Sequence, residues 1–92
     1  MESFKAHPDR VEALVLVEGC VWSSAQEIKI WDCRSFENIT SLKEPHSSRI
    51  RNLHWVSVSP DESFVWSGDT DGLICIWDIQ VRFLYRSVRG NN

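Results

Sequence analysis

An internal repeat constrains the fold of this 92-residue chain more strongly than any other feature. One copy opens on His7 and the other on His46, and the copies end on Trp-Asp pairs at 31–32 and 77–78. Between these marks each copy holds an Arg, then Val-Trp-Ser, then Ile-x-Ile before the Trp-Asp pair. The histidines stand 39 residues apart and the Trp-Asp pairs 46, and repeats of this length are typical of stacked structural units. The chain is therefore predicted to contain two copies of one unit.

The clearest secondary-structure signal is a hairpin over residues 64–78. Two runs of β-branched and aromatic residues, 64–67 and 73–77, flank a turn that contains Asp71-Gly72. An Asp-Gly step favours a tight hairpin because glycine accepts a positive φ at little steric cost. Both runs are apolar at successive positions, so we expect the sheet to be covered on both of its faces.

With these motifs the chain resembles the WD-repeat family of β-propellers over residues 4–89. The resemblance implies an all-β fold with two four-stranded antiparallel blades, one over 7–44 and one over 45–89. Residues 1–6 would be a frayed end or the outer strand of a preceding blade, and 90–92 a frayed end. Because a propeller closes with typically 4–8 blades, two blades are expected to be an incomplete fragment of a larger ring.

The resemblance also implies a buried hydrogen-bond network in each blade, formed by a His, a Ser, an Asp and a Trp. In the second copy these residues are His46, Ser67, Asp71 and Trp77. A Ser, a His and an Asp together also suggest a hydrolase triad, but the strand–turn–helix of a nucleophile elbow is not expected here. A structural network that satisfies its own polar groups is therefore the preferred interpretation.

The first copy departs from this pattern at its turn. The positions that match are His7, Ser23 or Ser24, and Trp31. The turn itself, residues 25–27, is two residues shorter than its counterpart and has no Asp. Glu27 offers only a loose substitute for the missing carboxylate. A weaker network and a less regular first blade are therefore expected.

Composition and spacing disfavour several classes of function. The three histidines show no zinc-ligand spacing and the four glycines form no phosphate-binding loop, so no metal site, cofactor or catalytic group is predicted. A net charge of −3 argues against nucleic-acid binding, and the sequence has no apolar run of the ~18 residues that a membrane span needs. Three cysteines without a C-x-x-C pair, and an N-terminus unlike a secretory signal, predict a reduced cytoplasmic setting, with a nuclear one left open.

Repeated cations suggest a surface for partners. Arg10 and Arg49 occupy the same place in the two copies, and the resemblance implies that this loop lies beside the turn after the second strand, on the partner-binding side. The candidate partner-binding residues are Arg10, Arg49, Arg51, Gln26, Asp69 and Thr70. They would form an electropositive rim for an acidic partner. The alternative is that they are ordinary solvated loop residues.

The predicted function is that of a non-catalytic protein-interaction or scaffold module within a larger propeller protein. Expected partners are other proteins or peptides, acidic ones among them, together with the remaining blades of a ring or further copies of the chain. The alternative is a regulatory propeller segment attached to a signalling enzyme such as a kinase, a phosphatase or an exchange factor.

Overall fold

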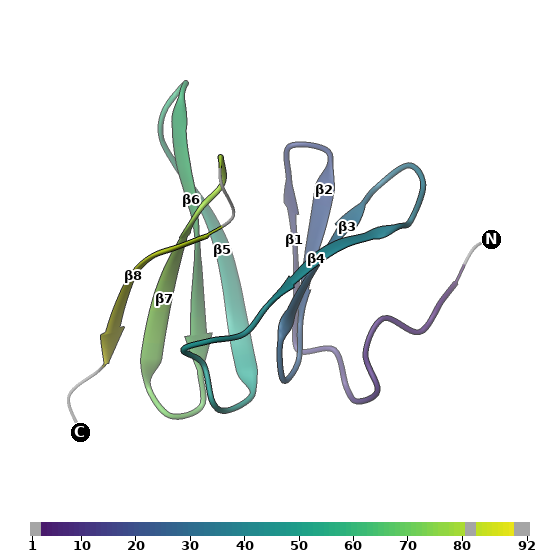
Figure 1. Cartoon of the computed structure of the whole chain (residues 1–92), viewed down its shortest axis with the longest axis horizontal. Helices are drawn as coiled ribbons and strands as arrows, with labels where there is room; N and C mark the ends of the chain where they lie inside the picture. The colour runs from purple at the N-terminus through teal and green to yellow at the C-terminus, as the bar shows by residue number, and fades with distance from the viewer. Residues whose placement is uncertain (1–2, 81–82, 90–92) are drawn as a thin grey trace.

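The computed structural model describes residues 3–80 and 83–89, which form two four-stranded sheets standing side by side (Figure 1). The strands are β1 (Ala13–Val17), β2 (Cys20–Ser24), β3 (Ile28–Asp32), β4 (Asn38–Leu42), β5 (Ile50–Ser59), β6 (Glu62–Asp69), β7 (Leu73–Asp78) and β8 (Phe83–Arg89). In each sheet the strands follow chain order, and every neighbouring pair is antiparallel. The described residues contain no helix. The prediction of an all-β fold with two four-stranded antiparallel blades is confirmed.

The two sheets fall within the two repeats of the sequence. Strands β1–β4 lie inside residues 7–44 and strands β5–β8 inside 45–89. Residues 3–6 form no strand, while residues 1–2 and 90–92, which belong to the predicted ends, lie outside the described residues. Across the part of the chain that the structure describes, no helix is long and apolar enough to cross a membrane.

Tight turns hold the hairpins of both blades in register. Glu18 and Gly19 form the two-residue turn between β1 and β2, and both have positive φ, 46° and 81°. Two such values are typical of a type I′ turn, whose twist matches that of the flanking strands. Between β6 and β7, Gly72 has a φ of 86°, and its N–H donates to the Asp69 carbonyl at 3.2 Å. The Asp71-Gly72 step therefore lies in the hairpin turn that the sequence predicts.

The second blade carries the longer leading hairpin. β5 has ten residues where β1 has five, and its pairing with β6 continues to Ser59 and Glu62. The β5–β6 tip therefore projects beyond the β1–β2 tip (Figure 1). Together with the longer β6–β7 turn, this hairpin explains why the two Trp-Asp pairs stand further apart than the two histidines.

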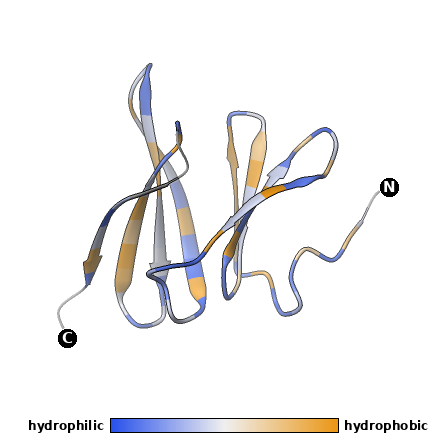
Figure 2. Ribbon diagram, viewed as in Figure 1, coloured by the Kyte–Doolittle hydropathy of each residue, from blue (hydrophilic) through white to orange (hydrophobic). Residues whose placement is uncertain are grey.

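The core lies between the two sheets. Ile28 and Ile30 on β3 are fully buried there, and they belong to one core cluster with Cys75 and Trp77 on β7 of the second blade. Because successive residues of a strand point to opposite faces, Ile74 lies on the far side of β7. Burying each isoleucine contributes about 1.5–3 kcal/mol. Figure 2 shows apolar residues along β7 and along the β1–β2 hairpin, which belong to different blades.

Candidate functional site

A buried chain of hydrogen bonds crosses the second blade. His46 precedes β5, and its backbone N–H donates to the Lys43 carbonyl at 2.7 Å. Its Nε2 lies 2.6 Å from the Ser67 Oγ, to which the Trp77 Nε1 donates at 2.8 Å. Its Nδ1 lies 2.7 Å from the Asp69 Oδ2. Because an ionised carboxylate only accepts, His46 donates from Nδ1, and the Ser67 hydroxyl donates to Nε2.

The acidic member of this network is Asp69, so the prediction of Asp71 is wrong. β6 continues through Asp69, and because alternate residues of a strand share a face, Asp69 points to the same side as Ser67. Asp71 is exposed in the following turn, where its backbone N–H donates to the Asp69 Oδ1 at 2.8 Å. The backbone N–H of Leu73 donates to the same oxygen at 3.1 Å. The sequence signal that identifies Asp69 is its two-residue spacing from Ser67.

Asp69 is held as a carboxylate inside the blade. Burial raises its pKa, but hydrogen bonds from His46 and from the backbone N–H groups of Leu73 and Asp71 outweigh burial, so the pKa lies below its usual range. The side chain is only 1% exposed. A carboxylate enclosed in this way cannot contact a partner, so Asp69 is removed from the candidate partner-binding residues.

Three members of the network are also joined in the first blade. Ser23 is the serine involved, because its Oγ lies 2.8 Å from the His7 Nε2 and accepts from the Trp31 Nε1 at 2.9 Å. Ser24 has another role. Its hydroxyl donates to the Ile50 carbonyl at 2.9 Å and so ties the first blade to the second.

The carboxylate member is missing from the first blade. Ala25 stands where the second blade has Asp69. As a result the His7 Nδ1 is buried without a hydrogen-bond partner among the described residues. Burial and the charge of Lys29 lower the pKa of His7, and the charge of Glu27 opposes them. Glu27 therefore acts on His7 through its charge and does not replace the missing hydrogen bond.

The remaining side chains that could carry chemistry are the cysteines and the potential metal ligands. Burial, followed by the charge of Asp69, raises the pKa of the Cys75 thiol to about 11. This thiol therefore stays protonated at neutral pH and behaves as a small apolar side chain. Within the described ranges, no three His, Cys, Asp or Glu residues are grouped so that they could hold a metal ion.

An ion-pair cluster joins the segment that precedes β1 to the start of β5 and the residue before it. Arg49 pairs through Nη2 with the Asp9 carboxylate, and its Nη1 donates to the Arg10 carbonyl at 3.1 Å. The Nη1 of Arg49 also lies 3.4 Å from the Glu12 Oε2. Glu12 receives two further cations, with the Arg10 Nε at 3.2 Å and the Arg51 Nε at 3.5 Å. We call these five residues, Asp9, Arg10, Glu12, Arg49 and Arg51, the seam cluster.

The seam cluster changes the predicted partner-binding surface. The Arg49 side chain is 18% exposed and serves to hold the two blades together. Arg10 and Arg51 are 77% and 59% exposed and remain accessible. Gln26 and Thr70 are exposed in the β2–β3 and β6–β7 turns, which lie at the same edge of the sheets as the seam cluster (Figure 1). Local sequence spacing could not reveal the pairing of Arg49 with Asp9, because these residues are 40 positions apart.

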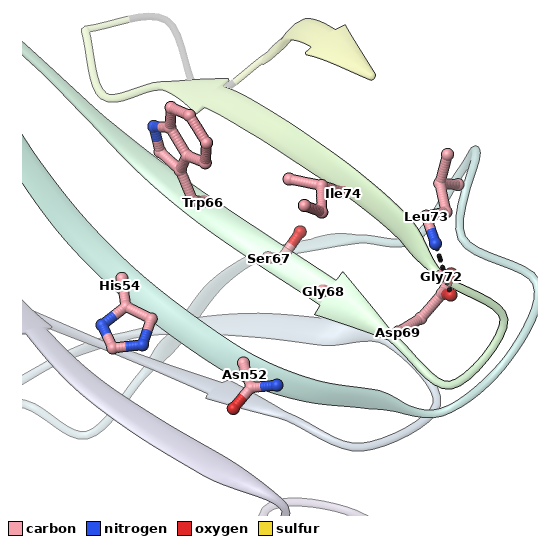
Figure 3. A pocket seen from close by; sticks show the side chains of 9 residues that line it. All are labelled: Asn52, His54, Trp66, Ser67, Gly68, Asp69, Gly72, Leu73 and Ile74. Carbon is pink, nitrogen blue, oxygen red and sulfur yellow. Dashed lines mark hydrogen bonds between the residues drawn. The ribbon is translucent and has the colours of Figure 1, made fainter. Parts of the chain in front are cut away.

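The far face of the second blade is open and apolar. A hollow of about 420 Å³ lies on it, and Figure 3 shows Trp66, Ile74 and His54 around this hollow. Trp66 is 42% exposed and Ile74 37% exposed. The matching side chains of the first blade, Trp22 and Ile28, are almost fully buried by the second blade.

The far face of the first blade is also partly uncovered. The Phe4 ring packs 5.0 Å from the Trp31 ring and 6.1 Å from the Phe36 ring, beside a hollow of about 290 Å³. Leu14 and Leu16 on β1 are 66% and 63% exposed on this face. Both ends of the two-blade stack therefore present apolar side chains.

Two proteins with similar sequences are named for the WD repeat. Cross-pathway control WD-repeat protein 2 of Flammulina velutipes is 33% identical over 64 residues, which make up 70% of the chain and 18% of that protein. WD repeat-containing protein GTS1 of Arabidopsis thaliana is 27% identical over 66 residues, 72% of the chain and 15% of that protein. The chain belongs to the WD-repeat family.

Further comparisons concern the length and the fold of this WD-repeat chain. No family model matches it. Protein tipD of Dictyostelium discoideum is 43% identical over 51 residues, 55% of the chain and 8% of that protein. The chain thus spans less than a fifth of the length of these curated relatives. Among solved structures, the computationally designed Ika8 protein is similar with a TM-score of 0.73 and 33% identity, over 92% of the chain and 26% of that protein.

Proposed function

We propose that the chain is a non-catalytic protein-interaction or scaffold module, and that its two WD-repeat blades are part of a larger propeller. The observation that carries this proposal is that the Ser, His and Asp side chains are hydrogen-bonded to one another inside the blade. Ser67 is 1% exposed, and its oxygen is engaged by both His46 and Trp77. Because these polar groups are engaged inside the blade, they stabilise it, and binding falls to the surface of the blade. The named WD-repeat relatives support the same class of function.

The open far faces support the larger propeller. Trp66, Ile74 and Leu14 are exposed, although the equivalent side chains inside the pair, Trp22, Ile28 and Leu53, are buried. Contiguous apolar surface of this kind typically marks an interaction site. A blade on each side would remove it from water.

The exposed cations point to the charge of the partner. Arg10 and Arg51 lie at the edge where the β2–β3 and β6–β7 turns also emerge, and both guanidinium groups are largely exposed. An acidic segment would be attracted to them. Charge at such a rim mainly speeds association and makes it sensitive to salt.

Peptide-binding kinetics test this proposal. A cooperatively folding protein that contains both blades is presented with acidic, neutral and basic peptides of equal length, and association rates are measured in low and high salt. We expect the acidic peptide to associate fastest in low salt, and Arg10→Glu with Arg51→Glu to slow it about tenfold. Arg34→Glu is the matched control, because Arg34 belongs to the β3–β4 connection at the opposite edge of the sheets (Figure 1). Equal rates for all three peptides would contradict the acidic partner.

The wider setting of the module remains a prediction. We predict a cytoplasmic location from the cysteine pattern of the sequence alone. A signalling enzyme attached to these blades is the alternative that the sequence leaves open.

A further inference from the structure

The leading hairpins of the two blades end at different levels. In the first blade Leu16 pairs with Val21, and in the second blade Trp55 pairs with Val65. These two pairs stand at equivalent levels, because each lies two residues beyond the pair that holds the network serine. Past that level β1 has one further residue, whereas β5 continues to Ser59. The second sheet therefore extends past the first blade, at the edge opposite the seam cluster (Figure 1).

This difference in length leaves Trp55 partly uncovered. Its cross-strand partner Val65 is fully buried in the core between the sheets, so Trp55 lies on the face that looks toward the first blade. The first blade turns back at Glu18 and Gly19, and Trp55 is 42% exposed. Because the space beside Trp55 lies over the first blade, a blade added at either far face would not cover it.

The charged side chains of the two hairpin tips are acidic. Glu18 is exposed in the β1–β2 turn, where it lines a hollow of about 200 Å³ together with Ile79 of the second blade. Asp61 and Glu62 are exposed at the β5–β6 tip. The β1–β2 hairpin contains no lysine or arginine, and neither does the β5–β6 hairpin beyond Arg51. The surface around Trp55 is therefore complementary in charge to a cation.

We infer that this surface, the hairpin notch formed by Trp55, Glu18, Asp61 and Glu62, binds a basic segment of a partner protein. A lysine or arginine of that segment would lie on the Trp55 indole, with its charge toward the carboxylates. The face of an aromatic ring attracts a cation, and the aliphatic stem of a lysine or arginine covers apolar surface. The inference rests on the proposed interaction module and adds a second surface to it, at the edge opposite the exposed arginines of the seam cluster.

Equilibrium binding of a lysine-rich peptide tests the indole. A cooperatively folding protein that contains both blades is titrated into the labelled peptide in low salt. Affinity is measured because aromatic contacts act mainly on dissociation. We expect Trp55→Ala to weaken binding about tenfold, and to leave the affinity for a glutamate-rich peptide of equal length unchanged. Trp66→Ala is the matched control, because Trp66 is also 42% exposed and lies on the opposite face of the same sheet.

The carboxylates of the hairpin notch are tested by a second variant. Glu18→Gln combined with Asp61→Asn should weaken binding of the lysine-rich peptide about threefold and should reduce its dependence on salt. Both residues are exposed in turns, so this variant tests the inference even if Trp55→Ala does not fold.

Two results would overturn the inference. One is an equal loss of affinity in Trp55→Ala and Trp66→Ala, and the other is an affinity for the lysine-rich peptide that the Glu18→Gln and Asp61→Asn pair leaves unchanged. Failure of the acidic peptide to bind would count against the proposed acidic partner, and it would leave the dependence of the lysine-rich peptide on Trp55 as it is.

Discussion

Two aspartates stand two residues apart after Ser67, and their side chains lie in opposite environments. Asp69 accepts from His46 inside the blade, whereas Asp71 is exposed in the turn. Asp69→Ala leaves a buried imidazole N–H unsatisfied and should lower the free energy of unfolding by about 1–3 kcal/mol. Asp71→Ala should change it by less than about 0.5 kcal/mol. Urea midpoints of a cooperatively folding protein that contains both blades measure the difference, and equal shifts would contradict the assignment of Asp69.

We expect the first blade to be the weaker element because its network ends at His7. Burial and Lys29 lower the folded pKa of His7 from 6.5, so the unfolded chain binds a proton that the folded blade does not. The stability associated with His7 is complete above pH 6.5 and is lost as the pH falls from 6.5 toward the folded pKa. Ala25→Asp should give His7 an acceptor and reduce this loss.

The pH dependence of unfolding checks this prediction about the first blade. Urea midpoints are followed from about pH 7 to about pH 5, the range in which histidine titrates. Ala25→Asn separates charge from hydrogen bonding, because its amide oxygen can also accept from the His7 Nδ1 but adds no carboxylate. If the wild type and Ala25→Asp lose stability in parallel, the unpaired His7 nitrogen is not the cause.

At the scale of the whole molecule, two blades leave two apolar faces uncovered. Each blade of a repeat protein buries its faces against its neighbours, and about three or more repeats are usually needed for stability. We therefore expect the isolated 92-residue chain to unfold over a broad temperature range and to associate non-specifically as its concentration rises. Sedimentation and thermal melting test this expectation. A compact monomer with a sharp transition would refute it.

Most of the fold could be predicted from the residues, because its signals are local. The Glu18-Gly19 and Asp71-Gly72 steps have the chemistry of tight turns, and runs of β-branched and aromatic residues form strands whatever lies beyond them. The duplicated His, Ser and Trp positions likewise mark the three residues that meet in each blade. Repetition places these residues at equivalent points of two sheets, and the resemblance to the WD-repeat family identified them as members of one network.

The tertiary structure decided the features that depend on how far a strand runs and on what packs against it. Asp69 replaces Asp71 in the network because β6 extends to Asp69, and the alternation of strand faces then directs its side chain to His46. Arg49 links the two blades because packing brings it into contact with Asp9, which lies 40 residues earlier in the sequence. The same packing covers the isoleucines of β3 and leaves Ile74 on an open face. The sequence by itself determined two blades, whereas their contact determined which faces and charges remain for a partner.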